Sequence, residues 1–251
     1  MSQPTPSLRR RADQLLVERG LFESRAKAQA AIAAGGVTAD GRTVARASDM
    51  VAPDATISAV PAHPYVSRGG VKLAHALDVF SIDVAGRHAL DVGASTGGFS
   101  QVLLERGAAH VTAVDVGRDQ LHPSLRGHPR LSSLEETDIR ALDRGRLPAP
   151  PSLVVCDVSF APLAAVLPAA LALARPDATL VALVKPQFEV GKRDIGKNGV
   201  VKDAGARERV VEAARALAAD MRFAELGVVP SPIAGGDGNV EYLLGARRGN
   251  G

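Results

Sequence analysis

The sequence predicts an α/β protein: a Rossmann-like, mostly parallel sheet of seven strands with helices on both faces, preceded by a small α+β domain. Strand-like and helix-like segments alternate over most of the 251 residues, which is typical of a parallel sheet covered on both sides. The composition is 46% hydrophobic but only 3% aromatic. Val, Leu and Ala therefore build the core, as in buried parallel strands.

The small domain is expected over residues 8–60. The pattern predicts helices over 11–19 and 25–34, with Ser24 capping the second and glycines ending both. Asp40-Gly41 is a hairpin-turn signal because apolar residues flank it. Short strand segments are expected around Val51 and Ile57.

Two prolines, Pro61 and Pro64, indicate a linker over residues 61–66. The second domain is expected over 67–248, with a loop up to Lys72 and a helix over 73–80. Further helices are expected over 98–106, 163–174 and 206–220, and strands over 89–92, 111–116, 131–134, 153–157, 180–184, 224–229 and 242–246. The last strand follows a glycine-rich loop, which favours antiparallel insertion into the sheet.

Charge and cysteine content limit the function classes. The net charge is +3, and residues 1–30 carry six basic and three acidic side chains, which is compatible with nucleic-acid binding. The single cysteine, Cys156, excludes an intramolecular disulfide and favours the cytoplasm. The longest apolar run, 160–174, is too short to span a bilayer, so we expect no stable membrane partner. No metal is expected.

The strongest local signal is Asp91-Val-Gly93-Ala-Ser95-Thr-Gly97-Gly98-Phe99, where the first strand of the sheet meets a helix. Glycines there allow a ligand to approach the backbone closely. The spacing differs from the Gly-x-Gly-x-x-Gly of dinucleotide sites, and Asp91 suits the cationic amino-acid end of S-adenosylmethionine. S-adenosylmethionine is therefore the favoured cofactor, with a dinucleotide or a purely structural turn as alternatives.

Further cofactor contacts are expected at the ends of the next two strands. Asp115 is placed to accept hydrogen bonds from ribose hydroxyls, and Asp138 to reach the adenine amino group, or else to be a solvated loop acid. The full set of predicted cofactor residues is Asp91, Gly93, Ala94, Ser95, Gly97, Gly98, Phe99, Asp115, Val116, Asp138 and Ile139.

Four ionisable residues are predicted to gather at one edge of the sheet: Lys72, Asp157, Lys185 and Glu241. Asp157 and Lys185 each end an aliphatic strand, and sites in such sheets lie beyond the carboxyl ends of the strands. Methyl transfer to a hydroxyl needs a group that takes the proton, and a lysine oriented by an aspartate can do so. For Lys72 and Glu241 a surface ion pair is the alternative.

Basic side chains near the N-terminus are candidate phosphate contacts. We expect RNA binding by Arg9, Arg10, Arg11, Arg25, Lys27 and Arg68, and by Lys192 and Arg193 of a basic loop over residues 191–199 that also contains Lys197. A solvated basic helix surface and a plain surface loop are the respective alternatives.

Five motifs together resemble the TlyA family, whose members are called both haemolysins and ribosomal RNA methyltransferases. They are Ser67-Arg-Gly-Gly-Val-Lys-Leu73, the loop Asp91–Phe99, Asp157-Val-Ser-Phe160, Val184-Lys-Pro-Gln-Phe-Glu-Val-Gly191 and Gly238-Asn-Val-Glu-Tyr242. They occur in the family's order between about residues 8 and 246.

The resemblance implies an FtsJ-like methyltransferase domain joined to the RNA-binding domain first seen in ribosomal small-subunit protein four. It implies 2′-O-methylation of cytidine in small- or large-subunit rRNA of ribosomal particles, with Lys72, Asp157, Lys185 and Glu241 as a Lys-Asp-Lys-Glu tetrad.

Two rival functions stay open on the sequence. A pore-forming haemolysin is disfavoured by the lack of a long amphipathic stretch. A base methyltransferase acting on an exocyclic amine is expected to carry Asn/Asp-Pro-Pro-aromatic where this chain has Asp157-Val-Ser-Phe160. A carbon-directed enzyme needs a nucleophilic cysteine, and Cys156 lies inside a predicted buried strand.

Overall fold

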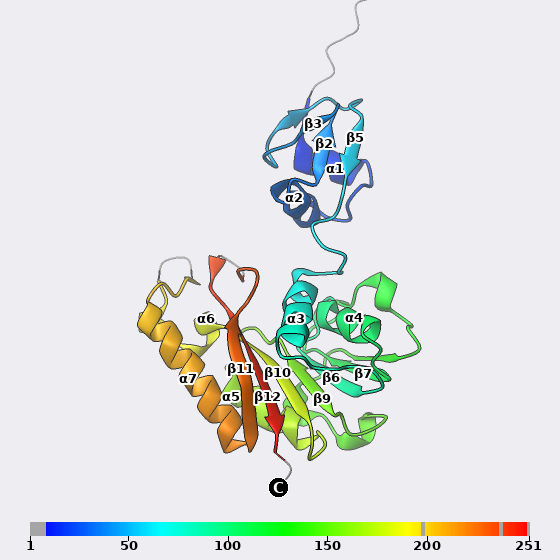
Figure 1. The fold of residues 1–251 in the computed structure, drawn as a ribbon. Coiled ribbons are helices and arrows are strands. Elements are labelled where there is room, and N and C mark those ends of the chain that lie inside the picture. The colour runs from blue at the N-terminus through cyan, green and yellow to red at the C-terminus, as the bar shows by residue number, and fades with distance from the viewer. Residues whose placement is uncertain (1–8, 197–198, 236–237, 250–251) are drawn as a thin grey trace, which may run out of the picture. The chain divides into compact units, whose positions relative to one another are not determined.

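A computed structural model of the chain describes residues 9–196, 199–235 and 238–249, and Figure 1 shows its ribbon. The chain divides into two compact units between Pro64 and Tyr65. Each unit buries a hydrophobic core of its own, which is the mark of separate domains.

The N-terminal unit packs two helices with two small sheets. Its elements are β1 (Arg10–Arg11), α1 (Ala12–Glu18), α2 (Arg25–Ala33), β2 (Val37–Ala39), β3 (Arg42–Thr43), β4 (Met50–Val51) and β5 (Ile57–Ala59). β1 pairs with β4, and β2 lies between β3 and β5, all antiparallel. The Ser24 hydroxyl accepts a hydrogen bond from the Lys27 amide, and Asp40 and Gly41 both have positive φ in the β2–β3 turn. The predicted cap and hairpin are confirmed.

The second unit contains the large sheet. Its helices and strands are α3 (Arg68–Val79), β6 (His88–Val92), α4 (Gly98–Glu105), β7 (His110–Val114), β8 (Leu131–Leu134), β9 (Leu153–Cys156), α5 (Leu163–Ala172), β10 (Thr179–Val184), α6 (Pro186–Glu189), α7 (Ala204–Asp220), β11 (Phe223–Pro230) and β12 (Tyr242–Arg248). Short 3-10 turns occur at Pro123–Leu125, Ile139–Ala141, Arg144–Arg146 and Lys192–Asp194.

The strand order of this sheet is β11-β12-β10-β9-β6-β7-β8. The strands from β10 to β8 are parallel to one another, while β12 runs antiparallel to both of its neighbours. The predicted seven-stranded, mostly parallel sheet and its antiparallel last strand are confirmed.

Helices cover both faces of the sheet (Figure 1). The core on one face joins α5 and α7 to the sheet, and the core on the other joins α3 and α4 to it. Successive strand residues point to opposite faces: Leu90 belongs to the first core and Ala89 to the second. Both faces are therefore dry, which explains the near-continuous aliphatic strands.

Helix α3 differs from the prediction. It begins at Arg68, five residues before the expected start, so Lys72 lies within the helix and not in a loop before it. Gly69 and Gly70 disfavour a helix locally, but at Gly70 tertiary packing requires the glycine. A Cβ atom at Gly70 would lie 2.6 Å from Cβ of Tyr65, so the missing side chain lets the preceding segment cross the helix.

No helix among the described residues is long and apolar enough to cross a membrane.

Gly70→Ala is expected to lower the free energy of unfolding by about 1–3 kcal/mol, because the added methyl overpacks the contact with Tyr65. Gly205→Ala is the matched control. Gly205 is also helical, in the first turn of α7, and the nearest atoms to an added Cβ are 3.5 Å away, so this variant gains helix propensity without a clash. Urea unfolding of both variants tests this, and equal stability of the two would contradict it.

Candidate active site

The four predicted catalytic residues lie at the edge of the sheet where the parallel strands end. Asp157 directly follows β9, and Lys185 directly follows β10. Because β12 is antiparallel to β10, with Tyr242 opposite Val184, Glu241 enters at this same edge. Lys72 reaches it from α3.

These four side chains form two ion pairs. Lys72 Nζ lies 2.5 Å from Glu241 Oε2, with the side chains 9% and 2% exposed. Lys185 Nζ lies 2.6 Å from Asp157 Oδ1, with the side chains 11% and 20% exposed. The Lys72–Glu241 contact is therefore a buried ion pair, and the surface-pair alternative is wrong. Breaking a buried pair by removing one partner typically costs about 3–5 kcal/mol.

Three neutral side chains surround the pairs, and the sequence reasoning assigned none of them. The Ser159 hydroxyl accepts a hydrogen bond from Lys185 Nζ at 2.9 Å. The ring of Phe188 lies below the same ammonium, 5.8 Å from its centroid. Gln187 Nε2 donates to Glu241 Oε1 at 3.2 Å. Each lies inside a motif that carries the family resemblance, so the motifs were the available signal.

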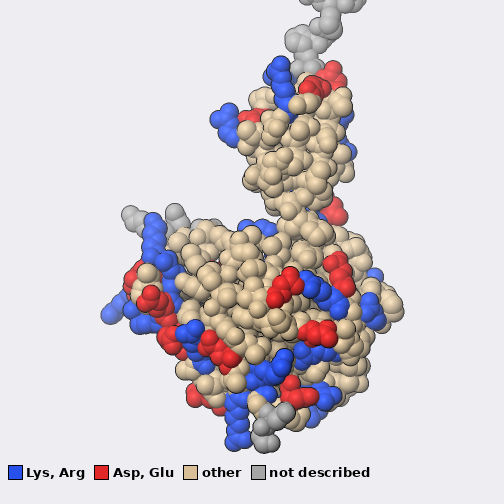
Figure 2. Space-filling view, in the orientation of Figure 1, with Lys and Arg blue, Asp and Glu red and all other residues tan. Residues whose placement is uncertain are grey.

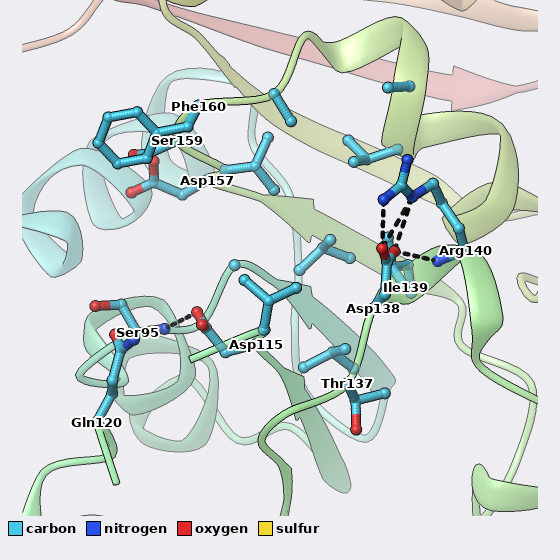
Figure 3. A pocket seen from close by; sticks show the side chains of 18 residues that line it. Ser95, Asp115, Gln120, Thr137, Asp138, Ile139, Arg140, Asp157, Ser159 and Phe160 are labelled. Carbon is cyan, nitrogen blue, oxygen red and sulfur yellow. Dashed lines mark hydrogen bonds and ion pairs between the residues drawn. The ribbon is translucent and has the colours of Figure 1, made fainter. Parts of the chain in front are cut away.

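A cavity of about 390 Å³ adjoins this edge, a size in the usual range for small-molecule sites. Its lining includes six of the predicted cofactor residues: Gly93, Ser95, Asp115, Val116, Asp138 and Ile139. Asp91, Ala94, Gly97, Gly98 and Phe99 are not among the lining residues. The lining also includes Thr137, Arg140, Asp157, Ser159 and Phe160 (Figure 3), which the cofactor prediction did not contain.

Two glycines shape the loop after β6. Gly93 has φ +81°, and a Cβ there would lie 2.6 Å from the backbone oxygen of Asp157. Gly97 has φ +89°, and its Cβ would lie 2.8 Å from Leu121 Cδ1. Positive φ and close approach both require glycine here. Gly93 thereby brings the cofactor loop against the segment that carries Asp157.

Asp115 is held in place by backbone donors. Its Oδ2 accepts from the Ser95 amide and its Oδ1 from the Gly117 amide, both at 2.7 Å. The Ser95 bond is drawn in Figure 3. A carboxylate has about four lone-pair sites, so the oriented group can accept further hydrogen bonds from a ligand in the cavity.

Asp138 already has a cationic partner. Arg140 donates to both of its carboxylate oxygens, at distances between 2.5 and 3.0 Å (Figure 3). This guanidinium lowers the pKa of Asp138 to about 2. Asp138 is therefore part of a partly exposed ion pair, and a ligand amino group at Asp138 would share the carboxylate with Arg140.

Asp91 is fully buried and does not line the cavity. Its Oδ2 accepts a hydrogen bond from the Ser100 hydroxyl at 2.7 Å, while its Oδ1 has no hydrogen-bond partner among the described residues. Burial, assisted by the charge of Asp157, raises the pKa of this carboxyl to about 7. Direct contact with the cationic end of the cofactor, as expected from the sequence, is not available to Asp91 in this arrangement.

Cys156 is fully buried in β9. Burial raises the pKa of its thiol to about 12, so it remains protonated and cannot act as a nucleophile at neutral pH.

Most predicted RNA contacts of the N-terminal unit have acidic partners. Arg10 pairs with Glu18 and Lys27 with Glu23. Arg11 and Arg25 both bind Asp13, which is fully buried and also accepts from Gln29. The Arg11 guanidinium holds the pKa of Asp13 far below its usual value. Figure 2 shows basic and acidic side chains close together on the visible face of this unit.

The structure describes some of the other predicted RNA-binding residues but not all of them. Arg9, Arg68 and Arg193 are exposed. The side chain of Lys192 and all of Lys197 lie outside the described residues.

Comparisons with known proteins follow the division of the chain. The FtsJ-like methyltransferase family matches residues 65–248, and the S4 domain matches residues 10–57. The 16S/23S rRNA (cytidine-2'-O)-methyltransferase TlyA of Mycobacterium tuberculosis is 48% identical over 241 residues, covering 95% of this chain and 90% of the relative. Hemolysin A of Brachyspira hyodysenteriae is 37% identical, covering 93% of this chain and 98% of the relative.

Among solved structures, a protein described as a hemolysin from Streptococcus thermophilus superposes with a TM-score of 0.76. It is 38% identical and covers 97% of this chain and 90% of its own. Fold, site and family match together define an S-adenosylmethionine-dependent methyltransferase with an RNA-binding S4 domain. The chain belongs to the TlyA family.

Asp91→Asn is expected to flatten the pH dependence of stability. The carboxyl titrates at about 7 when folded and near its ordinary 3.8 when unfolded. Its protonation therefore stabilises the fold below pH ~4, and this contribution is lost as the pH rises through about 7. Between pH 5 and pH 8 the free energy of unfolding of the wild type should fall by a few kcal/mol, on the order set by the pKa difference. The free energy of unfolding of the variant should not show this fall.

Urea unfolding at the two pH values measures this difference. Asp138→Asn is the control, because a carboxyl with a folded pKa of about 2 stays ionised across this range. The same pH slope in the wild type and in Asp91→Asn would rule out a protonated Asp91.

Proposed function

We propose that the protein methylates the ribose 2′-hydroxyl of cytidine in rRNA, with ribosomal subunits as substrates. The observation that carries this proposal is the position of Asp157. It lines the cavity beside the cofactor loop, and it binds Lys185, the cation at the end of the neighbouring strand. The methyl-donor site and a proton-handling lysine are therefore adjacent.

The cavity residues fit S-adenosylmethionine, which supplies a methyl group on a positively charged sulfur when bound. Asp115 retains acceptor capacity for ribose hydroxyls, and Asp138 for an adenine amino group beside Arg140. Val116 and Ile139 offer apolar contact for a flat ring. Asp91, Ala94, Gly97, Gly98 and Phe99 act on the donor indirectly, by shaping the loop that carries Gly93 and Ser95.

S-adenosylmethionine bound in this cavity would supply the methyl group to the 2′-hydroxyl oxygen, with its sulfur as the leaving group. Lys185 would accept the hydroxyl proton as an amine. The resulting ammonium ion would be stabilised by its ion pair with Asp157 Oδ1 at 2.6 Å. Lys72 and Glu241 form a buried ion pair with no net charge, which would hold α3 and β12 in place around the substrate ribose.

Phe160 is placed to stack on the target base. The residue is 91% exposed and lines the cavity, and its ring contacts that of Phe188 with ring centroids 5.1 Å apart. Its φ of +65° is strained for an aromatic residue. An exposed ring in a chain with so few aromatic residues is best used as a surface for a nucleotide taken out of its helix.

The S4 domain, which contains Arg11 and Arg25, is the part of the chain that would recognise rRNA. The relative from M. tuberculosis is named for both 16S and 23S rRNA, which supports ribosomal subunits as the substrate class. Asp13 uses part of the donor set of Arg11 and Arg25, but each guanidinium has five N–H groups. The N–H groups that do not contact Asp13 remain available to donate to phosphates, and the contacts with Asp13 hold both guanidinium groups in fixed positions.

Methylation of a base carbon is disfavoured because Cys156, the cysteine of the chain, is buried and protonated.

Lys185→Ala is expected to lower the methylation rate by about 10²–10⁴-fold, since it removes the proton acceptor, and to leave donor affinity nearly unchanged. Unmodified 30S and 50S subunits are incubated with isotope-labelled S-adenosylmethionine, and the rRNA is digested for nucleoside mass spectrometry. Lys202→Ala, at an exposed lysine, is the control. The wild type should yield labelled 2′-O-methylcytidine; label on a base, or normal turnover of Lys185→Ala, would refute the proposed chemistry.

The triple variant Arg9→Ala/Arg10→Ala/Lys27→Ala is expected to bind subunits more weakly while binding S-adenosylmethionine normally. Arg11 and Arg25 are left intact, because their removal would strand the buried charge of Asp13. If the three residues bind phosphates, the slope of log affinity against log salt should become shallower by about 0.7–0.9 for each phosphate that is no longer bound. An unchanged slope in filter-binding assays would exclude these residues from the interface.

A further inference from the structure

Lys185 has a second anchor besides Asp157. Its Nζ donates to the Ser159 hydroxyl at 2.9 Å and lies 2.6 Å from Asp157 Oδ1. The side chain is only 11% exposed, and the ring of Phe188 closes one side at 5.8 Å. The nitrogen therefore lies in a narrow, largely dry position with two polar partners.

The geometry of a lysine nitrogen gives the second anchor its importance. The nitrogen has three positions besides its bond to carbon. The ion pair with Asp157 Oδ1 draws the nitrogen toward the carboxylate, but that oxygen has no hydrogen-bond partner among the described residues, so the ion pair leaves the group free to rotate about the bond from Cε to Nζ. The hydrogen bond to Ser159 fixes one of the three positions. This limits the rotation and sets the directions of the other two positions, one of which is left for a substrate hydroxyl.

Ser159 is held where it can serve this purpose. It belongs to the segment after β9, whose backbone packs against Gly93, and the next residue, Phe160, has a left-handed conformation. Figure 3 shows Asp157, Ser159 and Phe160 together at the cavity. Ser159 thus stands between the donor cavity and the lysine, although it is not one of the four ionisable residues.

We propose that Ser159 is a positioning residue that aims Lys185 Nζ at the 2′-hydroxyl; the proposal rests on the function proposed above. A hydroxyl both accepts and donates hydrogen bonds. In this arrangement the Ser159 hydroxyl is the acceptor of a Lys185 N–H. An N–H is available to it both before and after proton transfer, so Ser159 can hold the nitrogen in both states while the lone pair of the amine is left to take the substrate proton.

Kinetics of the full-length enzyme on ribosomal subunits test the assignment. Ser159→Ala should lower kcat by about 10- to 100-fold, as misaimed catalytic groups do, while KM for subunits and Kd for S-adenosylmethionine stay within about twofold. Ser159→Thr keeps a hydroxyl and should recover most of kcat. Ser133→Ala, at an exposed serine on β8, is the control and should match the wild type.

Two kinetic results would overturn the assignment. Full kcat in Ser159→Ala, measured beside an inactive Lys185→Ala, would show that the lysine needs no second anchor. A loss of donor binding in Ser159→Ala would make Ser159 a cofactor contact instead of a positioning residue.

A second measurement does not depend on methyl transfer. Acylation of Lys185 by a small amine-reactive ester, followed by mass spectrometry of the free enzyme, reports how tightly the nitrogen is held. Ser159→Ala should react several-fold faster than the wild type, and Ser159→Thr should react like it. An equal or slower rate in Ser159→Ala would refute the anchor even if the rRNA assay failed, whereas the expected rates with no 2′-O-methylcytidine would refute only the proposed substrate.

Discussion

The buried ion pair between Lys72 and Glu241 is the interaction on which the rest of the site depends. It joins residues 169 positions apart and connects α3 to the start of β12. Helix α3 packs on α4, the helix that begins at the end of the cofactor loop, while β12 pairs with β10, the strand that ends just before Lys185. One contact therefore ties the donor side of the site to its catalytic side.

The antiparallel direction of β12 makes this contact geometrically available. In a wholly parallel sheet the residue before the last strand would lie at the opposite edge, away from Asp157 and Lys185. Insertion of β12 between β10 and β11 reverses this, so a residue at the start of a strand meets residues at the ends of others. The site is thus a consequence of sheet topology as much as of the four side chains.

The sequence predicted the sheet well because its strands are aliphatic runs bounded by turn residues, and Asp157 and Lys185 end such runs. The predictions from the sequence were wrong where residues far apart in the chain determine the local conformation. The pattern predicted a loop at Gly69 and Gly70, yet both lie in α3, and the close packing of Tyr65 leaves no room for a side chain at Gly70. Three further features depend on the directions of side chains, which residue spacing does not predict. They are the burial of Asp91, the ion pair between Arg140 and Asp138, and the binding of two arginines by Asp13.

The two halves of the site use different physical means. The donor side relies on backbone shape, with positive φ at Gly93 and Gly97 and backbone amides that orient Asp115. The catalytic side relies on charges that are largely withdrawn from water. Buried ion pairs contribute little to stability, because well-packed apolar residues of similar volume often stabilise a fold as much as an ion pair does, or more. In a core otherwise built from Val, Leu and Ala, stability does not explain two of them at one sheet edge, and this supports the proposal that they handle a proton beside the methyl donor.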